Sequence, residues 1–159
     1  PLSLAEGLNT VTISATDNAV PPNAQTVTWQ VTRITDLEGD PDHNGIPSLL
    51  EYAFNIDSAA VQQSMPTLSI AKNPDTNQPH LILTYRRRIL NPSNLVYTVE
   101  TSSDLSEWQS VESTAQILSA NPTQDGVTEF VTVRINPSLE GQVRRFARVS
   151  VMSTILETE

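Results

Sequence analysis

The chain begins with two stretches in which apolar and polar side chains alternate. Residues 9–17 (NTVTISATD) and residues 26–33 (TVTWQVTR) both follow this pattern. A period of two is typical of a β-strand with one buried face. The polar stretch between them, DNAVPPNAQ, contains two prolines and predicts a turn. We therefore expect an antiparallel hairpin whose apolar face is formed by Val11, Ile13, Ala15, Val27, Trp29 and Val31.

This predicted hairpin needs a partner. A two-stranded sheet has nothing of its own with which to bury an apolar face, and isolated hairpins are marginally stable in water. Trp29 and Ile13 must therefore be covered by the rest of the chain, by an upstream part, or by a neighbouring molecule.

Alternation returns in the last segment of the chain, residues 65–159. Asn, Pro and Gly cluster between the alternating stretches, as in NPSN, NPTQDG and NPSLEG, and these clusters are strong turn signals. Short strands at this spacing are typical of an antiparallel sandwich or barrel, and we expect a β-sandwich. The strands that we predict are residues 67–71, 80–87, 95–102, 107–111, 115–120, 128–135 and 144–152.

Between these two regions, residues 36–64 have a different pattern. Leu49 and Ala53, like Leu50 and Phe54, are four residues apart, which predicts a short helix with one apolar face. Pro47 is suited to the start of this helix, and Asn55 can adopt the left-handed conformation that ends one. Residues 57–64 (DSAAVQQS) predict a further turn.

Acidic residues precede this helix at a regular spacing. From Asp40 onward the chain matches every fixed position of the calcium-loop pattern D-x-[DN]-x-[DN]-G-x5-E. Calcium takes six to eight oxygen ligands, and a tightly wound loop with a glycine at its sharpest bend brings alternate side chains together. The alternative is a solvated acidic turn that caps the helix, but a coincidence of five fixed positions favours calcium. The predicted ligands are Asp40, Asp42, Asn44, the Ile46 carbonyl, Ser48 and Glu51.

The segment that enters this loop, VTRITDLEGD, predicts strand and turn instead of a helix. A paired, two-helix calcium sensor is therefore not expected, and the loop is interpreted as a static structural site. Extracellular modules of this kind bind calcium with a Kd of about 10⁻⁴ to 10⁻³ M.

Charge and composition exclude several classes of function. The net charge is −9; residues 1–60 hold eight acidic residues against one basic residue, and residues 61–159 hold ten against eight. An acidic chain lacks the electrostatic footprint for nucleic acid, and no apolar run is long enough to insert into a membrane. The absence of cysteine excludes disulfides and thiolate metal sites. The opening PLSLAEGLNT has no basic leader, so export would require a leader farther upstream.

No arrangement of residues indicates catalysis or a cofactor other than calcium, and we expect no enzyme activity. His43 and His80 have no partner at metal-ligand spacing and are predicted to be surface residues. The arginines of YRRR (85–88) are interpreted as solvated strand faces and edge protection, or else as a contact with the acidic half of another copy. Trp108, Tyr97 and Tyr85 are predicted to fill the core, with a sugar-stacking platform as the alternative.

The segment DHNGIPSLLEYAFNID resembles the DGDGIPDLLEYALGLDP-type calcium segment near the C-terminus of many large secreted bacterial surface proteins. It is also similar to thrombospondin type 3 and dockerin-like calcium loops. In those proteins a β module often follows, and YTVETSSDLSEW (97–108) and RFARV (145–149) resemble parts of it. Residues 6–33 resemble the last two strands of bacterial immunoglobulin-like surface domains. The resemblance implies an exported, multi-module protein. Asn44 and Ser48 replace acidic residues of the pattern, which implies weaker calcium binding.

Together these features predict a mainly β protein in three parts. Residues 1–35 form an immunoglobulin-like β-hairpin, residues 36–64 a calcium-loop and helix connector, and residues 65–159 a C-terminal antiparallel β-sandwich. The predicted function is that of an extracellular structural protein, a calcium-stiffened surface or filament subunit. Its partners would be other copies of itself, assembled head to tail by strand complementation, or neighbouring modules of a longer chain. The alternative is a carbohydrate-binding or adhesion module of a larger secreted enzyme.

Overall fold

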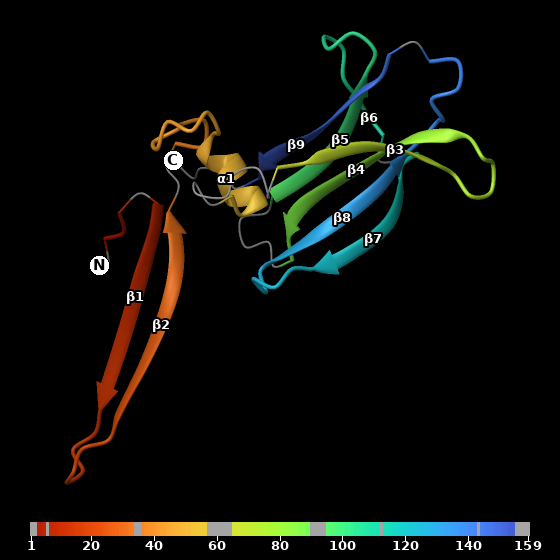
Figure 1. Ribbon diagram of the computed structural model, residues 1–159. Helices are drawn as coiled ribbons and strands as arrows, with labels where there is room; N and C mark the ends of the chain where they lie inside the picture. The colour runs from red at the N-terminus through yellow and green to blue at the C-terminus, as the bar shows by residue number, and fades with distance from the viewer. Residues whose placement is uncertain are drawn as a thin grey trace. The chain divides into compact units, whose positions relative to one another are not determined.

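The computed structural model describes residues 3–5, 7–33, 36–56, 65–89, 95–111, 113–142 and 144–154 (Figure 1). Within these ranges the protein is mainly β, with antiparallel sheets and one short helix, so the predicted fold class is confirmed. The predicted turn over residues 57–64 lies outside the described residues. None of the helical structure in the described ranges is long enough to cross a membrane.

The chain divides into two units, residues 1–39 and residues 40–159. The first unit contains strands β1 (Gly7–Thr16) and β2 (Ala24–Arg33). The second unit begins with the acidic loop and contains helix α1 (Ser48–Phe54) and every later strand. The acidic loop and α1 are thus parts of the same compact unit as the strands that follow them.

Strands β1 and β2 form the predicted antiparallel hairpin, in which Val11 stands opposite Trp29 and Ile13 opposite Val27. Residues opposite each other in an antiparallel pair share a face, so these four apolar side chains lie together. On the other face, the hydroxyl groups of facing residues form hydrogen bonds across the strands, Thr12 with Thr28 at 3.3 Å and Ser14 with Thr26 at 2.9 Å. The apolar face is exposed, with 54% of Ile13 and 49% of Trp29 accessible to solvent.

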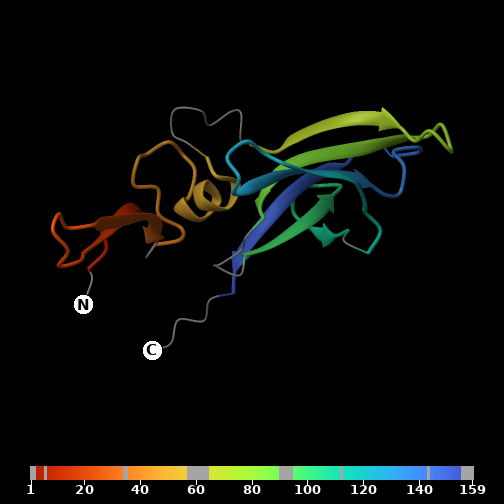
Figure 2. The same cartoon turned by 90° about the horizontal axis from the view of Figure 1, so that it is seen from below.

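The second unit contains two sheets (Figures 1 and 2). The four-stranded sheet has the order β3-β4-β8-β7, and the three-stranded sheet has the order β6-β5-β9. Two predicted strands, residues 95–102 and 128–135, have the observed bounds, whereas the strand predicted over residues 107–111 is only two residues long. The observed strands are β3 (Thr67–Lys72), β4 (Pro79–Arg88), β5 (Leu95–Ser102), β6 (Gln109–Ser110), β7 (Gln116–Pro122), β8 (Thr128–Ile135) and β9 (Phe146–Ser153).

Apolar side chains from both sheets share one core, which makes the unit sandwich-like. Leu81, Leu83 and Tyr85 of β4 and Val131 and Val133 of β8 are contributed by the larger sheet. Val99 of β5 is contributed by the smaller one, and Phe54 of α1 belongs to the same cluster. Tyr85 and Tyr97 lie with their rings stacked at a centroid separation of 6.3 Å. These tyrosines are therefore core residues, as predicted, and not part of an exposed platform.

Helix α1 packs through the predicted apolar positions Leu49, Ala53 and Phe54, all of which are buried. It begins after Pro47 and ends at Asn55, whose φ of 51° and ψ of 52° are in the left-handed region. Both boundaries agree with the prediction from the sequence, because they depend on local backbone chemistry.

Arginine side chains of β4 hold the C-terminal end of α1. Arg88 donates from Nε to the Tyr52 carbonyl at 2.8 Å, and its guanidinium lies 3.8 Å from the centre of the Tyr52 ring. Arg86 donates to the Asn55 carbonyl at 3.2 Å. Cations at the last carbonyl groups of a helix satisfy these acceptors and complement the helix dipole. The interpretation of this run as edge protection is wrong, because β4 lies between β3 and β8.

Candidate functional site

The acidic loop turns sharply in the backbone between Asp40 and the start of α1. His43 and Gly45 have φ angles of 57° and 85°, both in the left-handed region. Glycine reaches this region without steric cost, whereas other residues are strained there. The His43 N–H donates to the Asp40 carbonyl at 3.3 Å, which closes the first bend.

Asp40 organises the first half of the loop. One carboxylate oxygen accepts from the Asn44 N–H at 3.1 Å, and the other accepts from the Gly45 N–H at 2.8 Å. Desolvation acts to raise the pKa of Asp40, but hydrogen bonds from the Gly45 and Asn44 N–H groups outweigh it. The pKa of Asp40 is therefore lower than its ordinary value, and the carboxylate is charged at neutral pH.

Asn44 brings the other two carboxylates together. Its amide nitrogen, Nδ2, lies 2.9 Å from an oxygen of Asp42 and 2.7 Å from an oxygen of Glu51. Its amide oxygen, Oδ1, accepts from the Ile46 N–H at 2.8 Å. Asp40, Asp42 and Glu51 are thus each within hydrogen-bond distance of this one residue.

The second half of the loop is anchored to the sandwich unit. Ile46 is buried, and Glu51 lies in the first turn of α1, the helix that Leu49, Ala53 and Phe54 fix to the core. Among the described residues between the end of β2 at Arg33 and the loop, none is helical. The arrangement is therefore a single loop with one exiting helix.

The loop does not serve as a helix cap. Pro47 occupies the N-cap position and makes no side-chain cap hydrogen bond. The Leu50 and Glu51 N–H groups donate to the Pro47 carbonyl instead of to an acidic side chain. The capping alternative is therefore wrong, and the Asp40 and Asp42 carboxylates accept hydrogen bonds from groups of the loop itself.

The donor set is suited in type to a hard cation. Carboxylate, amide, hydroxyl and carbonyl oxygens are the groups that calcium prefers, and a bidentate Glu51 would bring the number to seven. The amide nitrogen Nδ2 of Asn44 faces the Asp42 and Glu51 carboxylates. The amide must therefore turn so that Oδ1, instead of Nδ2, points to a cation held by these carboxylates. In the part of the chain that the structure describes, no three His, Asp or Glu side chains already form a metal-holding group. The loop thus fits calcium in chemistry and spacing, and binding requires a rearrangement of its side chains.

The histidines are placed differently from each other. His43 is exposed, as predicted. His80 is buried, and its Nδ1 lies 3.1 Å from the Ile135 carbonyl, so the prediction of a surface position is wrong. His80 lies in β4 next to β8, and this strand order could not be derived from the sequence.

Two aspartates that the sequence analysis did not single out are the most highly connected acids of the sandwich unit. Asp104 accepts from Ser102, Ser106 and Glu107, and Asp125 accepts from residues of α1, β4 and β8. The signal that could have revealed them is local, because Ser-x-Asp and Thr-x-Asp within a loop are typical of side-chain-stabilised turns.

Comparison of the chain with protein-family models, with curated proteins and with solved structures finds no match.

Proposed function

We propose that this protein is an extracellular structural module, a subunit of a surface layer or filament, in which the hairpin adds to the β-structure of a neighbouring copy. The observation that carries this proposal is the exposed apolar face of β1 and β2, where Trp29 and Ile13 are about half accessible. A two-stranded ribbon of this kind gains stability only when a further sheet or strand covers it.

A second copy of the chain offers a complementary surface on its sandwich unit. Leu68 and Ile70 of β3 stand opposite Leu83 and Leu81 of β4, and therefore share their face of the sheet. Leu81 and Leu83 are buried, whereas Leu68 and Ile70 are 46% and 65% exposed. The apolar face of the four-stranded sheet thus continues beyond the residues that cover it. An added hairpin would bury this surface and its own apolar face at once.

Such a contact joins the hairpin unit of one copy to the second unit of the next copy. A head-to-tail contact between different surfaces does not close on itself unless its rotation forms a ring, so it builds fibres. Strand addition is a recurrent way of making such contacts, because free edges supply backbone hydrogen bonds and apolar faces supply burial.

Calcium has a stiffening role in this proposal. Asp40, Asp42 and Glu51 each accept a hydrogen bond from Asn44 in the loop that leads into α1. A bound calcium ion would hold the segment before α1 in one conformation and neutralise its clustered carboxylates.

Thermal unfolding with and without calcium tests the metal site. With a Kd of about 10⁻⁴ to 10⁻³ M, 10 mM Ca²⁺ would stabilise the native state by about 1.4 to 2.7 kcal/mol. Glu51→Gln and Asp40→Asn should abolish this stabilisation, whereas Asp75→Asn, a change of an exposed aspartate outside the loop, should retain it. An unchanged melting temperature of the parent protein in calcium would contradict the proposal.

Assembly is tested by light scattering and negative-stain electron microscopy over a range of protein concentrations, with and without EDTA. We expect filaments that shorten or dissociate in EDTA, and Trp29→Ser should prevent their formation because it removes the largest apolar side chain of the face. Thr28→Ser is the matched control, since it changes the opposite face and keeps the hydroxyl group. Discrete monomers at every concentration, indifferent to EDTA, would refute assembly and favour a binding module instead.

A further inference from the structure

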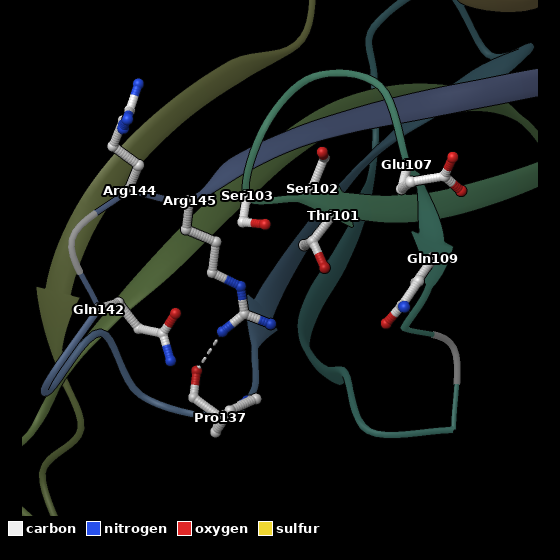
Figure 3. Close-up of a pocket in the computed structure, with 9 residues that line it drawn as sticks. All are labelled: Thr101, Ser102, Ser103, Glu107, Gln109, Pro137, Gln142, Arg144 and Arg145. Atoms are coloured by element: carbon white, nitrogen blue, oxygen red, sulfur yellow. Dashed lines mark hydrogen bonds between the residues drawn. The ribbon is translucent and has the colours of Figure 1, made fainter.

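A cavity of about 220 Å³ lies in the sandwich unit (Figure 3), and none of its lining residues belongs to the acidic loop. Its walls are formed by the end of β5, the start of β6 and the segments on either side of residue 140. Hydroxyl, carboxamide and guanidinium groups line it, together with the Glu107 carboxylate, and Pro137 is the only lining residue with an apolar side chain. A cavity with this lining favours a small, strongly hydrogen-bonding ligand over an apolar one.

Arg145 is the central group of this cavity. It donates from Nη1 to the Pro137 carbonyl at 2.7 Å and from Nη2 to the Asn136 carbonyl at 2.8 Å, which fixes the guanidinium in place. A guanidinium has five N–H groups, so these two bonds leave three others, including Nε–H, for a ligand. A pair of such parallel N–H groups matches the two oxygens of a carboxylate.

No carboxylate of a described residue forms an ion pair with Arg145. In the described ranges the ion pairs of the arginines involve Arg86, Arg87 and Arg148, and neither Arg144 nor Arg145 has a carboxylate within 4.0 Å. Desolvation lowers the pKa of Arg145 from its ordinary value, as expected for a half-buried cation without a counter-ion. A ligand that brings a negative charge would supply one.

Neutral hydrogen-bonding groups lie beside the guanidinium, and the charged side chains of Glu107 and Arg144 also line the cavity. Figure 3 shows it projecting between Gln142 on one side and Thr101 and Gln109 on the other. Thr101 is buried in β5, and its hydroxyl makes no hydrogen bond to another described residue. Ser102 forms a rigid part of the wall, because its hydroxyl bonds to Asp104 and accepts from the Leu105 N–H.

We propose that this cavity binds a hexuronate, the carboxylate-bearing sugar unit of an acidic polysaccharide. The carboxylate would pair with Arg145, and the ring hydroxyl groups would bond to Thr101, Gln109 and Gln142. The cavity volume is below the 300–1,000 Å³ of sites for drug-sized ligands, which limits the ligand to about one ring. An acidic peptide fits less well, because its several side chains need more room than this volume offers. The net charge of −9 also opposes unspecific attraction of polyanions, so binding must be local.

The test is a titration of the full chain with galacturonate, in which NMR measures the amide chemical shifts at each concentration. A ligand of this size is expected to bind with a Kd of about 1 mM. Glucose carries the hydroxyl groups without the charge, and acetate carries the charge without the ring. Each should bind at least about tenfold more weakly, because each loses half of the contacts. Equal binding of glucose or acetate would overturn the assignment, as would no shift of the Thr101 and Arg145 signals by about 50 mM galacturonate.

Two variants separate recognition from folding. Arg145→Lys keeps the charge but loses the paired N–H groups, and it should weaken galacturonate at least about tenfold. Thr101→Val is nearly isosteric and removes only the hydroxyl, so it should weaken the sugar severalfold while leaving acetate unchanged. Arg87→Gln, at an arginine paired with Glu129 outside the cavity, is the control and should bind as the parent does. Undiminished binding by both cavity variants would refute the site. Failure of filament assembly would not affect this result, because the cavity lies within one unit.

Discussion

Asp125 links three elements of the sandwich unit through one carboxylate. Its Oδ1 accepts from the Val127 and Thr128 N–H groups, both at 2.9 Å, within the turn between β7 and β8. Its Oδ2 accepts from Arg86 of β4 at 2.7 Å and from the Asn55 amide at the end of α1 at 3.0 Å. Burial acts to raise the pKa of Asp125, but hydrogen bonds from the Thr123 and Thr128 hydroxyls and from the Val127 and Thr128 N–H groups hold it well below its ordinary value.

We predict that Asp125→Ala lowers the free energy of unfolding by about 2–4 kcal/mol, because it removes several charge-assisted hydrogen bonds and leaves Arg86 without its ion pair. Urea unfolding followed by circular dichroism measures this change. Asp75→Ala, at an exposed aspartate, should change the free energy by less than about 0.5 kcal/mol. A loss for Asp125→Ala as small as that of the control would show that the network contributes little.

At the scale of an element, the turn after β5 is organised by another aspartate. The Asp104 carboxylate accepts from the Ser106 and Glu107 N–H groups at 2.9 and 3.0 Å and from the Ser102 hydroxyl at 2.9 Å. These hydrogen bonds, led by those from Ser106 and Glu107, lower the pKa of Asp104 to about 2. The turn therefore stays ordered over the pH range in which this carboxylate is ionised.

The pH dependence of stability follows from this shift. The pKa of Asp104 is lower in the folded state than in the unfolded state, so its stabilisation is complete above pH about 4 and is lost as the pH falls toward 2. We predict that Asp104→Ala destabilises the protein at pH 6 and that its difference from the parent shrinks by pH 2. Urea unfolding at pH 6, 4, 3 and 2 measures this difference. A difference that does not change with pH would contradict the role given to the ionised carboxylate.

The whole molecule consists of two units that differ in how well each can stabilise itself. The sandwich unit buries a core shared by two sheets and a helix. The hairpin unit has one sheet of two strands, with cross-strand hydroxyl pairs on one face and exposed apolar side chains on the other. Hydrophobic burial is the main favourable term in folding, and it is concentrated in residues 40–159.

We predict that a fragment of residues 40–159 folds on its own and unfolds cooperatively, whereas residues 1–39 alone show no cooperative transition as a monomer. Calorimetry and hydrogen exchange measure this. The fragment should also keep the calcium-dependent stabilisation, because all six proposed ligands lie within it. An unfolded 40–159 fragment would mean that the hairpin contributes to the core.

Local patterns in the sequence determined the β character, the approximate positions of the strands, the antiparallel hairpin and the short helix from Ser48 to Phe54. The spacing of the acidic residues in the loop is also a property of the sequence alone, and calcium binding by this loop stays a prediction. These features follow from alternation, helical spacing and turn chemistry among residues near one another in the chain. The left-handed Asn55 and Gly45 are examples, since each conformation depends on its own residue type.

Only the tertiary structure decided which distant residues meet. Asn55 and Asp125 are 70 residues apart, and Arg86 and Asp125 are 39 apart. The role of the arginine run, the burial of His80 and the polar cavity around Arg145 all depend on strand order and on how the sheets pack. Such contacts leave no periodic signal in the sequence, because the energy that selects them comes from burying the whole core at once.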